Sequence, residues 1–576
     1  MRKFLCILIF VGLSVSSLFA QSNLLASAND AYDRFHYREA IDLYEQLLKQ
    51  DPQNEEAEEK LAHAYRKIND SQNAERWYAQ LVQNPNTPSQ NKLYYAQSLA
   101  KNGKYKESRL WYKAFARESR SDERGQDFVK SYQDTSHFHD NAHKYEVKIA
   151  NFNSPEADFS PAYYREGIVF CSSRSYKKSP FKLKFNWNNS NYLDIFHIKG
   201  LYGQPEYFNK QINSKYHEGP LVFYNGDRSV IFTRNNYYKG KFRKSSEGIN
   251  KLKLYLADIK NGEWADIREF PFNDDEYSVG HPTLSTDGNT LYFVSDMPGS
   301  LGGTDIFKSN YQNGRWSLPE NLGEAINTPG NEMFPFIDAN DNLYFASDGH
   351  AGLGGLDLFY AKEAKGSYQQ PENLGVPINS SQDDFGLIIN LDRNKGYFSS
   401  NREGGLGDDD IYRFQVETCR RLFAIIDSNR QVFVKDAQIL ISDQISEKEG
   451  FYHQENDSIY SIDETWNSHW RIEVAKEGYA PQTYDLKEGD WLVCANAQEV
   501  DTIKIYLNPP ALIAKGGDPK KNPPFPGRGR PPYLTGGGDL PFDTTQVFEL
   551  KYIYYDLDRY YIRPEALHSG YWQHRA

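Results

Sequence analysis

Three aspartates recur at nearly equal spacing in similar glycine-rich surroundings. Asp305, Asp357 and Asp410 each follow a Gly-rich turn and open a short strand, so the unit returns after about 52 residues. Asp410 also ends the acidic run Asp408-Asp409-Asp410, and Ca²⁺ needs several carboxylates together. The two sibling loops supply a single aspartate each. We therefore predict that the repeated aspartates accept hydrogen bonds from loop amides, with a metal site as the alternative.

Residues that could carry catalysis are sparse. The chain has no G-x-S-x-G elbow, no H-E-x-x-H helix and no Cys/His cluster, and its histidines have no obvious partner in sequence. The Gly-rich segments do not open a helix after a strand, as a phosphate-binding loop must. We predict no catalytic residue, no metal and no cofactor. A site assembled from distant loops, and so an enzyme, stays open as the alternative.

The aspartate units belong to a longer β-rich segment, residues 145–417. Three clear copies begin at Leu291 (LYFVSDMPGSLGGTDIF), Leu343 (LYFASDGHAGLGGLDLF) and Gly396 (GYFSSNREGGLGDDDIY), and two divergent copies lie upstream. A turn rich in Gly, Asn or Asp precedes each first strand, which suits tight hairpins. These units predict an all-β propeller of about five four-stranded blades, with six as the alternative.

Residues 23–135 carry a helical pattern with its own repeat. A small residue recurs every 34 residues, and a tyrosine follows four residues later on the same helix face. The small residue allows two helices to approach closely. These repeat-defining positions are Ala40, Ala74 and Ser108, followed by Tyr44, Tyr78 and Tyr112. The period is that of tetratricopeptide helix pairs, and the segment resembles an all-α solenoid of three such units.

The N-terminus and the composition indicate export. Residues 1–20 have the features of a secretory signal peptide: Arg2 and Lys3 precede an apolar stretch that ends at Ala20. No later run is long and apolar enough to span a membrane. The net charge of -12 argues against a nucleic-acid partner, which needs a basic surface. We expect the mature chain to be exported and soluble.

Short alternating segments in residues 418–508 predict a small β-sandwich. Near its end, Lys476-Glu477-Gly478-Tyr479 resembles a turn of carboxypeptidase-regulatory-like domains. Cys419 and Cys494 bracket this segment, and an exported protein could join them by a disulfide. Cys171 lies in an apolar strand and is predicted to be a buried thiol. Residues 509–543 are rich in Pro and Gly and predict an extended linker.

Residues 544–576 resemble the opening of an OmpA-like, peptidoglycan-binding domain. The resemblance rests on the motif residues Tyr555, Asp556, Asp558, Arg563 and Pro564. The ligand-binding residues of such a domain lie further along and have no counterpart before Ala576. We interpret the segment as a truncated α/β start that cannot fold alone.

The order of these parts resembles the multidomain OmpA-family envelope proteins of Bacteroidetes, and in particular the PorE-type component of the type IX secretion system. The resemblance implies a non-enzymatic periplasmic scaffold, associated with the outer membrane, that holds envelope proteins through its helical and propeller surfaces. In full-length relatives it also implies peptidoglycan binding. The alternatives are a propeller-based hydrolase or glycan-binding module, and a non-functional truncation product.

Overall fold

The computed structural model describes residues 23–175, 184–200, 203–416, 419–444, 450–464, 469–486 and 502–509. The chain divides into two compact units, Met1–Gln415 and Val416–Ala576. The predicted signal peptide, most of the predicted linker and the OmpA-like start lie outside the described residues. No helix of the described ranges is long and apolar enough to cross a membrane.

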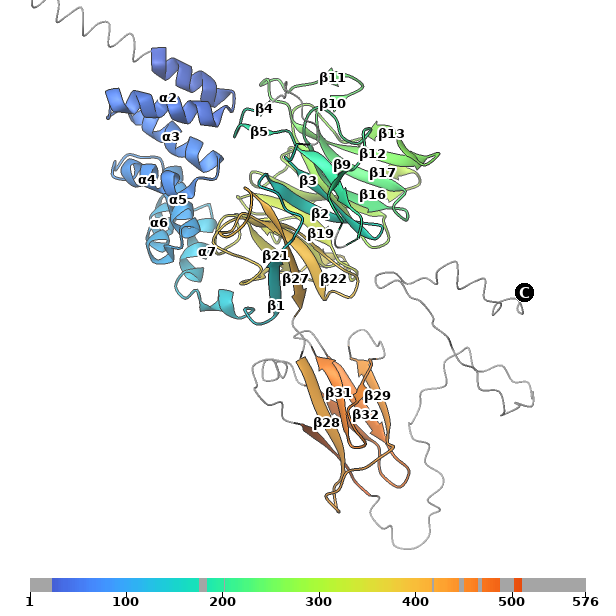
Figure 1. The fold of residues 1–576 in the computed structure, drawn as a ribbon. Helices are drawn as coiled ribbons and strands as arrows, with labels where there is room; N and C mark the ends of the chain where they lie inside the picture. Colours follow the sequence, from blue (N-terminus) through green and yellow to red (C-terminus); the bar gives the residue numbers. More distant parts are fainter. Residues whose placement is uncertain are drawn as a thin grey trace, which may run out of the picture. The chain divides into compact units, whose positions relative to one another are not determined.

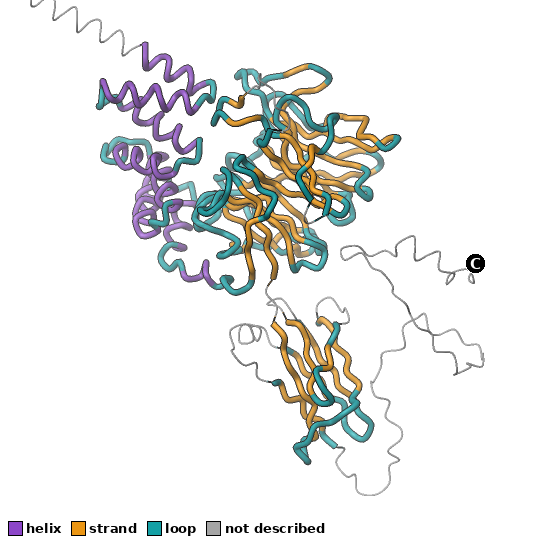
Figure 2. The backbone as a smooth tube through the Cα atoms, viewed as in Figure 1, coloured by secondary structure: helices purple, strands orange, loops and turns teal. Residues whose placement is uncertain are grey.

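The first unit begins with a layer of helices, coloured purple in Figure 2. Residues 23–33 are helical. The helices that follow are α2 (Tyr37–Gln50), α3 (Glu55–Lys67), α4 (Ser71–Leu81), α5 (Ser89–Lys101), α6 (Tyr105–Glu118) and α7 (Arg124–Ser131), with the 3₁₀ turn η1 (Ser136–His139) after them. Each helix packs mainly on its neighbours in the chain. The side chains of Asn54 and Asp70 accept hydrogen bonds from backbone N–H groups and so cap α3 and α4.

The repeat-defining positions of the helices lie in this core. Ala40, Ala74 and Ser108 are fully buried, and Tyr44, Tyr78 and Tyr112 are buried with them. Where serine replaces alanine, its hydroxyl donates a hydrogen bond to the carbonyl of Ala96 on α5 (2.7 Å). The larger side chain is therefore accommodated because its polar atom is satisfied.

Five antiparallel sheets follow the helices (Figure 1). The first contains β2 (Asp158–Tyr164), β3 (Gly167–Ser172), β6 (Asp194–Ile198) and β7 (Glu206–Tyr207). The second contains β8 (Glu218–Tyr224), β9 (Ser229–Asn235), β12 (Leu252–Lys260) and β13 (Glu263–Glu269). The third contains β14 (Val279–Leu284), β15 (Thr290–Ser295), β16 (Asp305–Gln312), β17 (Arg315–Trp316) and β18 (Glu320–Asn321).

The fourth sheet contains β19 (Glu332–Ile337), β20 (Leu343–Ser347), β21 (Asp357–Ala361) and β24 (Glu372–Asn373). The fifth contains β25 (Asp384–Ile389), β26 (Lys395–Ser400), β27 (Asp410–Val416) and, beside β27, β1 (Tyr145–Ile149). The earliest strand of the segment thus completes the latest sheet. The small hairpins are β4 (Lys184–Phe185) with β5 (Ser190–Asn191), β10 (Tyr237–Tyr238) with β11 (Lys241–Phe242), and β22 (Glu363–Ala364) with β23 (Ser367–Tyr368). The prediction of a propeller-like, β-rich middle segment is confirmed.

An asparagine side chain joins each sheet to the next. Asn213, in the loop before β8, accepts from the N–H of Ile195 (2.7 Å) and donates to its carbonyl (2.9 Å), as a neighbouring strand would. The same pair of bonds links Asn273 to Leu254, Asn327 to Ile306, Asn379 to Leu358 and Asn153 to Ile411. Since Asn153 precedes the first sheet and Ile411 belongs to the fifth, the repeated contact also closes the ring.

The second unit contains two sheets around one core. One contains β28 (Cys419–Asp427), β30 (His453–Gln454), β31 (Ile459–Glu464) and β34 (Ile503–Leu507), and the other β29 (Gln438–Asp443), β32 (Trp470–Ala475) and β33 (Gln482–Asp485). Phe423, Ile441 and Ile472 are among the buried side chains between them. In the Lys476–Tyr479 turn, Gly478 has φ +83° and the hydroxyl of Tyr479 donates to Asp427 (2.7 Å). This bond holds the turn against the end of β28.

Candidate functional site

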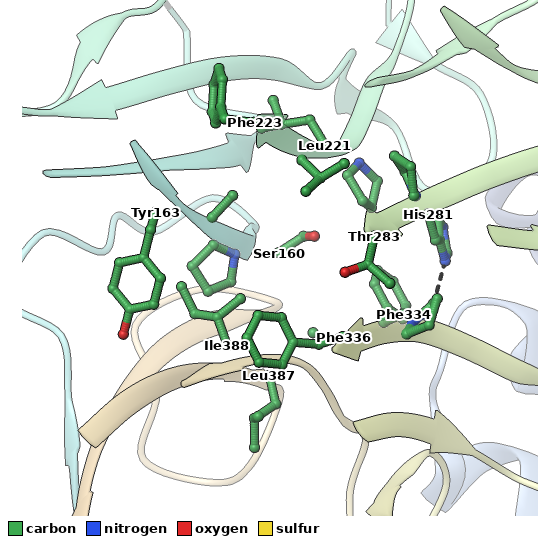
Figure 3. Close-up of a pocket in the computed structure, with 17 residues that line it drawn as sticks. Ser160, Tyr163, Leu221, Phe223, His281, Thr283, Phe334, Phe336, Leu387 and Ile388 are labelled. Atoms are coloured by element: carbon green, nitrogen blue, oxygen red, sulfur yellow. Dashed lines mark hydrogen bonds between the residues drawn. The ribbon is translucent and has the colours of Figure 1, made fainter. Parts of the chain in front are cut away.

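The first strands of the five sheets surround a central cavity. Each of β2, β8, β14, β19 and β25 contacts the next, and β25 contacts β2 again. The cavity that they line has a volume of about 200 Å³. Figure 3 shows side chains from these strands gathered around one space. We call it the central channel.

A bulge interrupts the pairing of every channel strand. The register slips at Phe159/Ala162 in β2 and at the equivalent place in β8, β14, β19 and β25. At four of the bulges the backbone has a positive φ, at Ser160, His281, Phe334 and Gly386. Bulges re-aim side chains and tolerate proline, which cannot donate to a ladder. Pro161, Pro220, Pro282 and Pro335 all line the channel.

The channel is lined by aromatic, aliphatic and hydroxyl side chains. The rings come from Tyr163, Phe223, Phe334 and Phe336, in addition to the four prolines and His281. The lining that the structure describes has no Asp, Glu, Lys or Arg. A channel of this composition suits an uncharged ligand that is partly apolar.

His281 lines the channel with a polar ring. Its backbone N–H donates to the hydroxyl of Thr233 (3.0 Å), and its ring stacks on Phe334 with centroids 4.1 Å apart. Burial lowers the pKa of His281 to about 3, so the imidazole is neutral at pH 7. Nδ1 accepts from the N–H of Phe334 (3.3 Å, Figure 3), which leaves the proton on Nε2. Within the described ranges Nε2 has no hydrogen-bond partner, so it can donate to a ligand.

The three repeated aspartates lie away from the channel. Asp305 accepts from the N–H of Leu301 (2.7 Å) and Gly302 (3.2 Å), and Asp410 accepts from the loop before β27 in the same way. Asp357 accepts from the N–H of Leu353. Each aspartate opens the third strand of its own sheet, so the three are not brought together. In the described part of the chain, no group of three or more His, Cys, Asp or Glu could hold a metal ion.

The described lining of the channel contains none of the cysteines and none of the C-terminal motif residues. Cys171 is a buried free thiol, and burial raises its pKa. The predicted partner of Cys419, Cys494, lies outside the described residues, so the disulfide stays a prediction. The motif residues Tyr555, Asp556, Asp558, Arg563 and Pro564 also lie outside them.

Sequence reasoning missed the channel residues, although two patterns could have revealed them. One is the proline that recurs near the start of the first four sheets, as in Asp158-Phe-Ser-Pro161 and Glu332-Met-Phe-Pro335. The other is the asparagine a few residues before it, as in Asn153. Both are short and set in variable loops, and the Gly-rich turn is the more conspicuous repeat.

Comparison with known proteins returns structural neighbours only. No family model and no curated protein matches the chain. Among solved structures, a gluconolactonase of Xanthomonas campestris is 11% identical, with 47% of this chain and 90% of that chain covered and a TM-score of 0.29. An exo-β-1,3-galactanase of Clostridium thermocellum is 12% identical, with 59% and 82% covered and a TM-score of 0.31. An α-L-arabinofuranosidase of Lactobacillus brevis is 11% identical, with 46% and 92% covered and a TM-score of 0.29.

These neighbours correct the functional prediction made from the sequence. All three are named as enzymes, which contradicts the prediction of a non-enzymatic scaffold and the prediction that the chain is not an enzyme. They agree better with the alternative, a propeller-based hydrolase or glycan-binding module. The scaffold prediction rested on a resemblance in domain order, and no family model or curated protein matches the chain to support that resemblance. TM-scores this low do not decide an activity, which has to be argued from the channel itself.

Proposed function

We propose that the protein binds a glycan and seats an uncharged sugar ring in the central channel. The observation that carries the proposal is a channel that combines aromatic rings with neutral polar groups, the hydroxyls of Ser160 and Thr283 and the imidazole of His281. A pyranose has an apolar C–H face that packs on rings such as Tyr163 and Phe336, and a hydroxyl rim that accepts hydrogen bonds. The volume of about 200 Å³ suits a single ring.

Cleavage of the bound glycan would make the protein a hydrolase, which is the other possibility in the alternative stated above. Hydrolysis of a glycosidic bond uses two carboxyl groups, about 5 to 9.5 Å apart. Neither is present in the described channel lining. The geometry therefore supports binding, and a catalytic pair would have to come from other residues of the chain. Product formation in the assay below separates the two.

Two finer proposals accompany this function. The 34-residue spacing and the buried Ala40/Tyr44-type positions support an assignment of the helices to tetratricopeptide-like repeats. The signal-like N-terminus supports export, so the glycan would be an envelope or extracellular polymer.

Titration of the full chain with neutral oligosaccharides tests the proposal. Tyr163→Ala removes a ring that lines the channel and is 39% exposed, so little core is lost. We expect affinity to fall about tenfold, the loss of one stacking contact. The matched control is Tyr311→Ala, which removes a tyrosine that is 42% exposed and does not line the channel. Equal affinities for both variants, or no saccharide bound by the wild type, would contradict the proposal.

A further inference from the structure

A second cavity lies where the helices meet the loops of the fourth and fifth sheets. Its volume is also about 200 Å³. Arg66 and Lys67 at the end of α3 line it, as do Lys101 at the end of α5 and, from the loops around the fourth sheet, Asp348 and Asp383. All of these residues belong to the first unit. We call it the junction cavity.

One wall of the junction cavity is a closed ion pair. Nζ of Lys101 lies 3.0 Å from both carboxylate oxygens of Asp383, and the side-chain amide of Asn69 donates to the same carboxylate (2.6 Å). Burial alone would raise the pKa of Asp383, but the Lys101 ammonium group holds it below its ordinary value. Asp348 is also engaged, because it accepts two hydrogen bonds from Asn331 (2.7 and 2.9 Å). Both carboxylates therefore have partners.

Two other cations that line the junction cavity, Arg66 and Lys67, form no ion pair with the described residues. The guanidinium of Arg66 lies 3.8 Å over the ring of Tyr94, and its hydrogen bond is a long one to Gln97 (3.5 Å). In the described ranges no carboxylate lies within ion-pair distance of Arg66 or Lys67. Loss of solvent lowers the pKa of Lys67, and the charge of Arg66 lowers it further. An anion bound between them would relieve this repulsion.

The rest of the lining is suited to a ligand rich in hydroxyl groups. Ser71, Gln97 and Ser98 also line the junction cavity. The Ser71 hydroxyl donates to Asn102 (2.7 Å) and the Ser98 hydroxyl to the carbonyl of Tyr94 (2.8 Å), so both oxygens can still accept a hydrogen bond from a ligand hydroxyl. Three ways in which peptides bind are a free strand edge, an apolar groove for a helix and an aromatic-lined groove for a proline-rich segment, while recognition of an acidic group by arginine applies to a peptide and to a sugar acid alike. The apolar side chains of the lining are those of Ala74 and Leu356, and no strand is part of it. The observations favour a ring-sized ligand with one anionic group and several hydroxyls.

We propose that the junction cavity is a subsite for an acidic sugar, whose carboxylate binds between Arg66 and Lys67. This inference rests on the proposed function, because it presumes that the protein binds a glycan. It adds a second position and a preference for charge that the central channel, without ionic side chains, cannot supply. The planar guanidinium of Arg66 can hold a carboxylate through two parallel N–H groups.

Oligogalacturonate and its methyl ester are the matched probes. They share the sugar rings, and the ester lacks the charge. We expect the full-length wild type to bind the acid about tenfold more tightly than the ester. Arg66→Ala and Lys67→Ala should each abolish most of that preference, because the acid loses more affinity than the ester. Lys113→Ala, which removes an exposed lysine of α6 outside the cavity, is the control. Melting temperatures of all variants verify that they are folded.

The outcomes separate this inference from the proposed function. Equal affinity for acid and ester, or an acid preference that survives in both variants, overturns the acidic-sugar subsite. In that case ester binding that is lost in Tyr163→Ala still supports the central channel. No binding of either probe, or of the neutral panel, overturns both proposals. An acid preference that Lys113→Ala also removes would indicate general surface attraction and would overturn the subsite.

Discussion

The central channel and the junction cavity have the same volume and opposite chemistry. Each encloses about 200 Å³. The channel is built from equivalent positions of five strands, each with a bulge, and four of the five also supply a proline. The junction cavity is built from non-equivalent residues, where helix ends meet loops of two sheets. The comparison shows that equivalent positions of the five sheets form an uncharged lining. Charged side chains line the cavity where the helices contact loops that are not equivalent.

The largest loss of stability is expected when the ion pair between Lys101 and Asp383 is broken. Lys101→Met leaves Asp383 buried without its cation, and removal of one partner of a buried pair costs about 3 kcal/mol. Lys104→Met, which breaks the more exposed pair with Glu75, should cost less than about 1 kcal/mol. Denaturant unfolding of both variants measures the difference. Equal losses would show that the junction pair does not fasten the helices to the sheets.

Acid should lower the stability of the protein through His281. Its pKa is about 3 in the folded protein and about 6.5 in the unfolded chain, so the unfolded chain binds more protons between these values. The contribution of His281 to the free energy of unfolding is complete above pH 6.5. It is lost as pH falls toward 3, by about 2 kcal/mol at pH 5. His281→Asn keeps a residue type that tolerates the positive φ and cannot titrate. The free energy of unfolding of the variant should fall less between pH 7 and pH 5. Parallel losses in both proteins would contradict the assignment.

Salt should weaken the binding of an acidic saccharide at the junction cavity and leave the binding of a neutral saccharide in the central channel unchanged. Raising ionic strength from about 0.05 to 0.5 M shortens the screening length severalfold. Preference for the acidic over the esterified saccharide should fall about fivefold, because it depends on Arg66 and Lys67. Affinity for a neutral saccharide should not change, since the channel lining has no ionic side chain. Calorimetric titrations at both salt concentrations provide the measurement, and the same fall for both ligands would refute the contrast.

The smallest effect is expected when Ca²⁺ is added to or removed from the repeated aspartates. Their carboxylates already accept backbone and asparagine donors, as Asp305 does from Leu301, Gly302 and Asn321. Neither added Ca²⁺ nor EDTA should therefore change the Tm. Asp305→Asn should lower the stability by about 1 to 2 kcal/mol, because it leaves loop amides less well satisfied. A rise in Tm with Ca²⁺ that this variant abolishes would instead favour the metal alternative.

Local patterns predicted much of the fold and little of the site. Asp305, Asp357 and Asp410 mark a repeat because turn and strand preferences act over a few residues. Ala40 and Tyr44 mark helix packing for the same reason. His281 and Tyr163 carry no such pattern. They become neighbours only when distant strands converge, which periodicity does not report.

The sequence by itself determined the repeat units, their turns and the helical spacing, because these depend on residues close together in the chain. The tertiary structure alone decided how the ring closes and where the cavities lie. Asn153 meets Ile411 across 258 residues, and Lys101 meets Asp383 across 282. Such contacts depend on the summed geometry of five sheets and on the position of the helical layer. No short segment contains that geometry, so the chemistry of both cavities emerges only from the folded chain.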